Sequence, residues 1–159
     1  MYREFYFLIE AYFRTLDKKE AIYEIGIPIL ISVMLPFVFN ITINKDFMLS
    51  IINLMAIILG FIIATITILL TSGDSNLKLT KEYFLDKKIF GKNLTLFRKL
   101  LILFFYIAFI AMVELIASIF TIYFECYNKI SSFFNLLLIL HLILISIRNL
   151  TNLFFIEFK

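Results

Sequence analysis

Three ionisable residues lie deep within long apolar stretches of the C-terminal half of the chain. Glu114 is near the middle of the run 99–124, and His141 and Arg148 lie within the run 131–156. A carboxyl group and an imidazole can exchange protons or contact an ion. At such depth in a membrane helix, charged groups are costly and normally face a bundle interior or a water-filled cavity. Glu114 and His141 are therefore the first candidates for function, whereas the long Arg148 side chain is expected to anchor a helix end.

Glu114 and His141 are predicted to lie at the same depth. Each is about ten residues from the short turn that joins the two runs, which places both about 15 Å from that end of the helices. A Glu114–His141 contact is therefore expected between antiparallel helices. Two interpretations stay open: a hydrogen bond that only holds a bundle together, or a water-filled path in which the histidine titrates. Further polar groups for such a path would come from Asn53, Thr67 and Asn152.

Composition identifies the chain as an integral membrane protein. Hydrophobic residues make up 62% of its 159 positions and charged residues 17%, whereas soluble domains average about 45–50% and about 25%. Four runs exceed the about 18 apolar residues typical of a membrane-spanning helix; they are 21–43, 47–71, 99–124 and 131–156. The predicted fold is a single all-α, four-helix transmembrane domain over residues 1–159.

The distribution of basic residues predicts the orientation. Most lysines and arginines lie in residues 1–20 and in the connection 72–98, whereas the two other connections carry one each, Lys45 and Lys129. The positive-inside rule then places both termini and the 72–98 connection in the cytoplasm. We expect a multi-pass protein of the bacterial inner membrane with very short external loops.

Small and polar residues recur along one face of the second run. Gly60 and Ala64 form a small-xxx-small pair that lets another helix approach closely, and the asparagine and threonine named above share their face. Helix packing and the lining of a narrow pore both stay open for this face, with packing the preferred interpretation. A similar face in the third run contains Ala108 and Ala111 and is also expected at a helix interface.

Two further segments lie outside the predicted spans. Residues 1–20 have apolar residues at helical spacing and balanced charges, which predicts an N-terminal amphipathic helix at the membrane interface or beneath the bundle. In the 72–98 connection, a short helix capped at Asp74 or Ser75 is predicted to run up to Gly91. Its basic side could contact lipid headgroups, or a cytosolic protein, nucleotide or oligonucleotide. The basic residues are Lys78, Lys81, Lys87, Lys88 and Lys92.

No motif for catalysis or metal binding occurs in the sequence. It has no HExxH zinc motif, no P-loop and no GxSxG elbow, and it has a single histidine and a single cysteine, Cys126. His141 and Glu114 alone fall short of the three protein ligands of a catalytic zinc site. We therefore expect no enzymatic activity, no cofactor, no metal and no intrachain disulfide.

In format, the chain resembles the small four-helix membrane proteins of bacterial anti-phage defence systems, such as the membrane subunit of the Kiwa system and pore-type effectors paired with a nucleotide-synthesising enzyme. The shared features are cytoplasmic termini, very short external loops, a basic connection between the second and third spans, and no catalytic motif. The resemblance implies a homo-oligomer, such as a tetramer, that perturbs the inner membrane when a cytosolic partner or nucleic-acid-like ligand signals infection.

Three functions follow as hypotheses. The leading one is an oligomeric membrane effector, channel-like or membrane-disrupting, that is controlled from the cytoplasmic side. The second is a non-conducting membrane anchor or sensor that recruits a cytosolic effector through the basic connection. The third is a small transporter or holin-like protein. Conductance distinguishes the first hypothesis from the second.

Overall fold

The computed structural model describes residues 2–71 and 80–157. In this part of the chain, four helices are long and apolar enough to cross a membrane; they are Lys18–Val38, Lys45–Thr71, Leu96–Tyr123 and Lys129–Leu153. Each coincides within a few residues with one of the runs predicted from the sequence. About 82% of the structure is helical, so the all-α class is confirmed, as expected of a multi-pass membrane protein.

The elements in chain order include two π-helical segments, η1 and η2. The order is α1 (Tyr2–Thr15), α2 (Lys18–Ala21), η1 (Ile22–Gly26), α3 (Ile27–Val33), η2 (Met34–Val38), α4 (Lys45–Thr71), β1 (Phe84–Ile89), β2 (Lys92–Thr95), α6 (Leu96–Tyr123) and α7 (Lys129–Glu157). The first spanning helix comprises α2 to η2. Pro28 lies in the first turn of α3 and Pro36 lies within η2. Because a proline has no amide hydrogen to donate, the helical hydrogen-bond pattern changes around Pro36.

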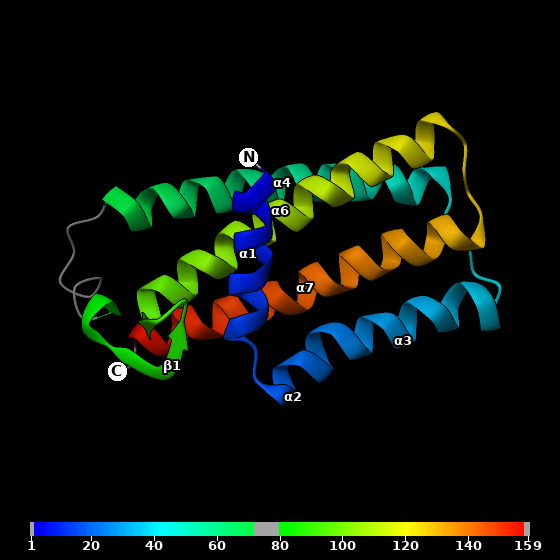
Figure 1. Ribbon diagram of the computed structural model, residues 1–159. Helices are drawn as coiled ribbons and strands as arrows, with labels where there is room; N and C mark the ends of the chain where they lie inside the picture. The colour runs from blue at the N-terminus through cyan, green and yellow to red at the C-terminus, as the bar shows by residue number, and fades with distance from the viewer. Residues whose placement is uncertain (1, 72–79, 158–159) are drawn as a thin grey trace.

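The long helices are arranged as a row. Helix α4 packs against α6, α6 against α7, and α7 against α3, and Figure 1 shows the four running roughly alongside one another. Helices α6 and α7 are therefore the inner members and supply much of the core, including Leu103, Ile107, Leu142 and Ile145. As an outer member, α4 contributes one buried side to this core and leaves much of its other surface exposed.

Helix α1 crosses the row instead of running along it (Figure 1). It lies against α6, where the Phe5 ring contacts Phe109 and the Tyr12 ring stacks on Tyr106. The amphipathic pattern of the first residues therefore does form a helix, and one part of its apolar face covers the bundle. Other large apolar residues of α1, among them Tyr6, stay exposed.

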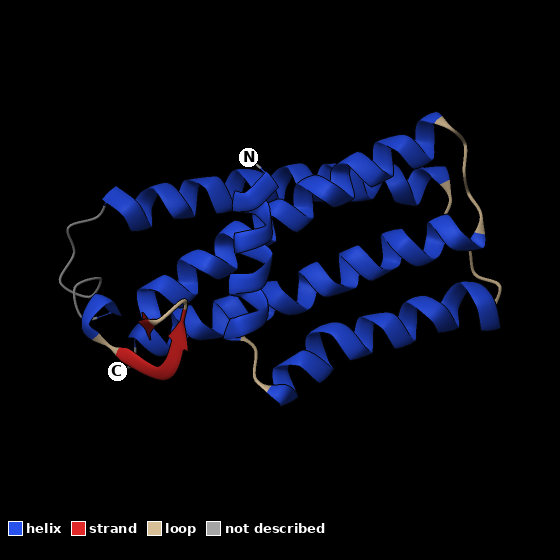
Figure 2. Cartoon of the chain, in the orientation of Figure 1, coloured by secondary structure: helices blue, strands red, loops and turns tan. Residues whose placement is uncertain are grey.

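A β-hairpin replaces the second half of the helix that the sequence pattern predicted between the second and third spans. Strands β1 and β2 pair antiparallel, and Figure 2 shows the hairpin in red at one end of the bundle. Phe90 and Gly91 connect the strands with φ angles of 50° and 76°. Two successive positive φ values fit the tight turns of hairpins and not a helix, so the helix prediction is wrong over β1. The predicted caps Asp74 and Ser75 lie outside the described residues. We call this end of the bundle the hairpin end.

Candidate functional site

The hairpin end contains a buried cluster of charged side chains around Arg148. Its Nε atom lies 2.7 Å from Glu24 Oε1 and its Nη1 atom lies 3.2 Å from Glu20 Oε2. The Arg148 and Glu24 side chains are only 10% and 5% exposed. Neither contact has the direction of a hydrogen bond, so the attraction is that of ion pairs. Since a buried charge is tolerated only when it is paired, Arg148 joins α7 to the first spanning helix instead of merely anchoring a helix end.

Tyr12 connects α1 to this cluster. Its hydroxyl donates a 2.7 Å hydrogen bond to Glu24 Oε2, and its ring lies 3.6 Å from the Tyr106 ring, centroid to centroid, and nearly parallel to it. The Arg148 guanidinium carbon is 5.6 Å from the Tyr12 ring centroid. Burial, followed by the hydrogen bond to Glu24, raises the pKa of Tyr12 above its ordinary value, so the phenol stays neutral and donates. Glu24 is thereby shared between α1 and α7.

Glu20 extends the cluster toward α6. Its carboxylate lies 3.8 Å from Lys99 Nζ and also accepts the backbone N–H of Asp17 at 2.8 Å, which closes a capping box at the start of α2. Tyr12, Glu20, Glu24, Lys99 and Arg148 are named below the hairpin-end cluster. They come from α1, α2, η1, α6 and α7, so five elements meet at this group of charges.

The hairpin itself is attached through Lys87. Its Nζ atom lies 2.6 Å from Asp17 Oδ1 and donates a 2.9 Å hydrogen bond to the Thr15 carbonyl oxygen. These contacts hold β1 to the link between α1 and α2, directly beside Glu20. The hydrogen bond from Lys87 lowers the pKa of Asp17 below its ordinary value.

This pKa shift predicts how the contact responds to acid. A carboxyl whose pKa is lowered by folding stabilises the folded contact above its unfolded pKa, about 3.9 for Asp. That contribution is lost as the pH falls through the lowered value. A carbon-13 NMR titration of the Asp17 carboxyl should give a midpoint below that of an unperturbed aspartate. In Lys87→Met the midpoint should return upward; an unchanged midpoint in Lys87→Met would contradict the contact.

His141 is bound to residues other than the predicted Glu114. Its Nδ1 atom lies 2.6 Å from the Glu24 carbonyl oxygen and its Nε2 atom lies 3.2 Å from the Tyr106 hydroxyl. Because a carbonyl oxygen can only accept, Nδ1 carries a proton, and Nε2 of a neutral ring accepts from Tyr106. Both nitrogens are therefore used, and the expected Glu114–His141 hydrogen bond is not formed. Residue counting gives depth along a helix but neither its rotation nor the crossing angle of its neighbour.

Glu114 belongs to a second buried cluster on α6 and α7, nearer the opposite end of the bundle. Its side chain is fully buried, and Oε1 accepts a 3.1 Å hydrogen bond from Ser118. Ser118 is 3.5 Å from Asn135 Oδ1, and the Asn135 amide donates to Thr121 at 3.3 Å. Glu114 Oε2 has no hydrogen-bond partner in the described structure. This carboxyl can therefore accept a proton or a polar group that approaches through the bundle.

The predicted face of α4 points away from the rest of the chain. Asn53, Gly60, Ala64 and Thr67 are all exposed, and a Cβ atom added to Gly60 would meet nothing within 4 Å. Gly60 therefore has free space beside it, and none of the four residues belongs to the described hydrophobic core. The side of α4 that faces the bundle is formed by other apolar side chains, among them Met48, Ile51, Met55 and Ile62, whereas further large apolar residues such as Ile57 and Phe61 are exposed beside the predicted face.

The remaining predicted residues have mixed positions. Ala111 is fully buried inside α6 and Ala108 is half-buried, consistent with helix packing. Asn152 is half-buried and its Nδ2 atom has no partner in the described structure. Asn149, which follows Arg148 in the sequence, is 2% exposed, and both of its amide atoms are unpartnered among the described residues.

The basic residues predicted to form one surface lie in different environments. Lys87 is used inside the protomer, and Lys81 lies 5.0 Å from the Phe97 ring centroid. Lys88 and Lys92 are exposed on the hairpin. Lys78 lies outside the described residues. The free positive charge of the described connection is therefore concentrated on the hairpin.

The hairpin-end cluster was missed from sequence although a signal for it exists. Glu24 is an acidic residue within the first predicted apolar run, one helical turn after Glu20. Two acids on one face of a spanning helix require cations nearby, and Arg148 and Lys99 are the intramembrane cations available. Among the described residues, no group of three His, Cys, Asp or Glu side chains could hold a metal ion.

Comparison with known proteins gives no relative from which a role could be transferred. No protein-family model, no curated protein and no solved structure matches the chain. What the described residues define is a multi-pass membrane protein with two buried polar clusters and an exposed face of small and polar residues on one outer helix.

Proposed function

We propose that this protein is an oligomeric, channel-like effector of the bacterial inner membrane, controlled from the hairpin end, which faces the cytoplasm in this proposal. The observation that carries it is the exposed face of α4. Asn53 is exposed on this face, and an amide that faces hydrocarbon without a partner is costly. Small residues at Gly60 and Ala64 allow a second backbone to approach. Another copy of the chain meets both requirements.

Closed cyclic symmetry is the usual arrangement of such copies. A ring built through α4 would bring Asn53 and Thr67 of every protomer to a shared interface. The four helices form a row in the described protomer (Figure 1), so the proposed path for ions lies between protomers or along the buried polar groups. The unpartnered oxygen of Glu114 and the two-sided contacts of His141 support a polar route of the second kind.

Control from the hairpin end follows from how the charges connect the elements. A ligand that displaces the hairpin would also displace Lys87 and its partner Asp17. Because the backbone N–H of Asp17 donates to Glu20, the displacement would reach Glu20 as well. Glu20 contacts both Lys99 and Arg148, so a displacement at the hairpin reaches α6 and α7. The resemblance to anti-phage membrane proteins suggests infection as the trigger.

A non-conducting membrane anchor is the alternative function, and one observation favours it. The exposed side chains Lys88 and Lys92 lie on the same hairpin and form a positively charged surface suited to an acidic cytosolic partner. Conduction is not needed for such a role.

The test combines membrane potential with assembly size. Cells that express the wild type should depolarise, and the purified protein should migrate as an oligomer. Gly60→Leu adds bulk where the protomer has free space, so it should leave the protomer folded but abolish both oligomer and depolarisation. Val33→Leu, at an exposed position of α3, is the matched control and should change neither.

Two further variants examine the polar route. Glu114→Ala and His141→Ala should each alter depolarisation at matched expression if ions or protons pass these groups. A well-expressed wild-type oligomer that leaves the membrane potential unchanged would reject conduction and favour the anchor. An oligomer that survives Gly60→Leu would reject the α4 interface.

A further inference from the structure

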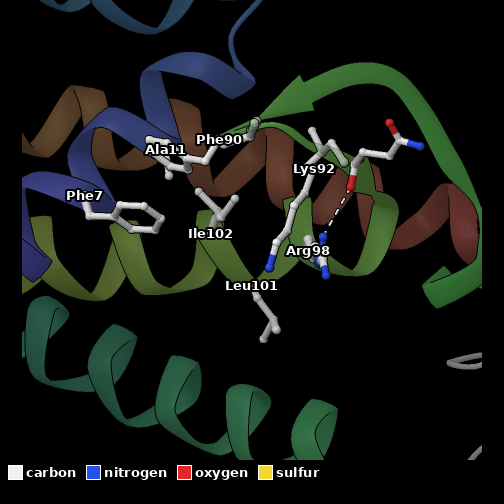
Figure 3. A pocket seen from close by; sticks show the side chains of 10 residues that line it. Phe7, Ala11, Phe90, Lys92, Arg98, Leu101 and Ile102 are labelled. Carbon is white, nitrogen blue, oxygen red and sulfur yellow. Dashed lines mark hydrogen bonds between the residues drawn. The ribbon is translucent and has the colours of Figure 1, made fainter.

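A cavity of about 380 Å³ lies at the hairpin end between α1, the hairpin and the first turns of α6. Its walls are mostly apolar and include Phe7 of α1 and Leu101 and Ile102 of α6. Two cations also line it, Lys92 of β2 and Arg98 of α6. Figure 3 shows the Lys92 and Arg98 side chains extending toward Leu101. The cavity thus combines a positively charged part with an apolar part.

The two cations have no acidic partner among the described residues. Arg98 Nη1 donates to the Asn93 carbonyl oxygen at 3.3 Å, and neither Arg98 nor Lys92 forms an ion pair with a described residue. The described residues that line the cavity include no acidic side chain. Both side chains are exposed, so an incoming anion does not have to displace a carboxylate.

The position of the cavity along the membrane helix limits what can occupy it. Arg98 lies two residues after the start of the spanning helix Leu96–Tyr123, and Leu101 and Ile102 lie about one turn further in. The cations are therefore at the level of headgroups and the apolar wall is at the level of acyl chains. A soluble nucleotide would bury its sugar and base against apolar side chains without enough hydrogen-bond partners.

We propose that this cavity binds one acidic phospholipid. The phosphate lies between Lys92 and Arg98, and the first part of an acyl chain lies along Phe7, Leu101 and Ile102. Basic pockets at the ends of membrane helices select acidic headgroups in this way. The bound lipid joins α1, the hairpin and α6 at the end where the charged cluster lies. This site is independent of whether the protein conducts ions.

The absence of tryptophan from the chain gives a direct assay. Phe7→Trp places a single tryptophan in the cavity wall, which can be excited selectively over the eight tyrosines of the chain. The protein is reconstituted in phosphatidylcholine vesicles that contain a small fraction of brominated lipid. Brominated phosphatidylglycerol should quench this tryptophan more strongly than brominated phosphatidylcholine. Leu30→Trp, at an exposed position of α3 and outside the proposed α4 interface, reports the bulk lipid and should be quenched equally by both.

Charge variants assign the preference to the two cations. Lys92→Gln and Arg98→Gln should each lower the preference for phosphatidylglycerol about fivefold, which corresponds to about 1 kcal/mol per cation near an anionic surface. Lys88→Gln removes an exposed charge from the same hairpin but outside the cavity and should have little effect. Lipid that copurifies with the tryptophan-free protein, counted by mass spectrometry, should fall in the Lys92→Gln/Arg98→Gln double variant.

Three results would overturn the proposal. Equal quenching of Phe7→Trp by both lipids would mean that the cavity has no headgroup preference. If the preference for phosphatidylglycerol is unchanged in the Lys92→Gln/Arg98→Gln double variant, then charges other than these two cause it. Loss of the preference in excess inorganic phosphate, with equal lipid counts in wild type and double variant, would identify a site for a small soluble phosphate instead of a lipid.

Discussion

Arg148→Met should destabilise the protein by about 3–5 kcal/mol, the usual result of removing one partner from a buried ion pair. The substitution leaves Glu24, whose side chain is 5% exposed, without its cation, and Glu20 loses a contact at 3.2 Å. Thermal or denaturant unfolding of the detergent-purified protein gives the free energy of unfolding directly. Because the apolar methionine keeps most of the side-chain volume, the decrease in the free energy of unfolding comes from the lost charge more than from lost packing.

A surface pair and a double variant serve as controls for this prediction. Arg14→Met makes the same chemical change in the exposed pair with Glu10, 2.7 Å apart, where about 0–1 kcal/mol is expected. Combining Arg148→Met with Glu24→Gln should restore part of the lost stability, because the carboxylate is then no longer buried without a counter-charge. Equal losses in Arg148→Met and Arg14→Met, or a double variant no more stable than the single one, would contradict a buried pair.

Tyr12→Ala should release α1 from the bundle and cost about 3–5 kcal/mol, as for other large buried aromatic side chains. Tyr12 is fully buried, stacks on Tyr106 and donates to Glu24. Few other residues of α1 are buried, so loss of this side chain removes its main attachment. Hydrogen exchange of the α1 amides should increase strongly, whereas the amides of α6 and α7 should change much less.

Two substitutions separate the ring from the hydroxyl. Tyr12→Phe keeps the stacking but leaves a Glu24 oxygen without its donor, which should cost about 1–3 kcal/mol. Tyr6→Ala removes a tyrosine of the same helix that is 69% exposed and should be nearly neutral. If Tyr6→Ala increases the hydrogen exchange of the α1 amides as much as Tyr12→Ala does, then the attachment of α1 to the bundle does not depend on the buried Tyr12 ring.

Glu24 links the N-terminal helix α1 to the bundle through its contacts with Tyr12 and Arg148. Glu24 accepts from Tyr12 on one side and faces Arg148 on the other. Its backbone carbonyl also contacts His141. A single residue in the π-helical segment η1 thus contacts α1 and α7 through different atoms. Irregular helical turns of this kind are common at functional positions.

The positions of the long helices follow from the amino-acid sequence alone. The lengths and apolar content of four runs were sufficient to place four spanning helices within a few residues, because a membrane helix satisfies its own backbone and needs no partner to be recognised. Helical spacing also predicted α1. The hairpin was not recognised, because lysines and aromatic residues at 83–90 suit an amphipathic helix, whereas the positive φ values of Phe90 and Gly91 are a property of the folded chain.

Which polar residues contact one another depends on how the helices pack in the folded chain. Equal depth suggested a Glu114–His141 contact, but the rotation of each helix about its axis brings His141 to Tyr106 and Glu24, and leaves Glu114 with Ser118. The charged cluster joins residues more than a hundred positions apart, Glu24 and Arg148. Periodicity describes one helix at a time, so which faces of neighbouring helices come together is set by side-chain packing between them.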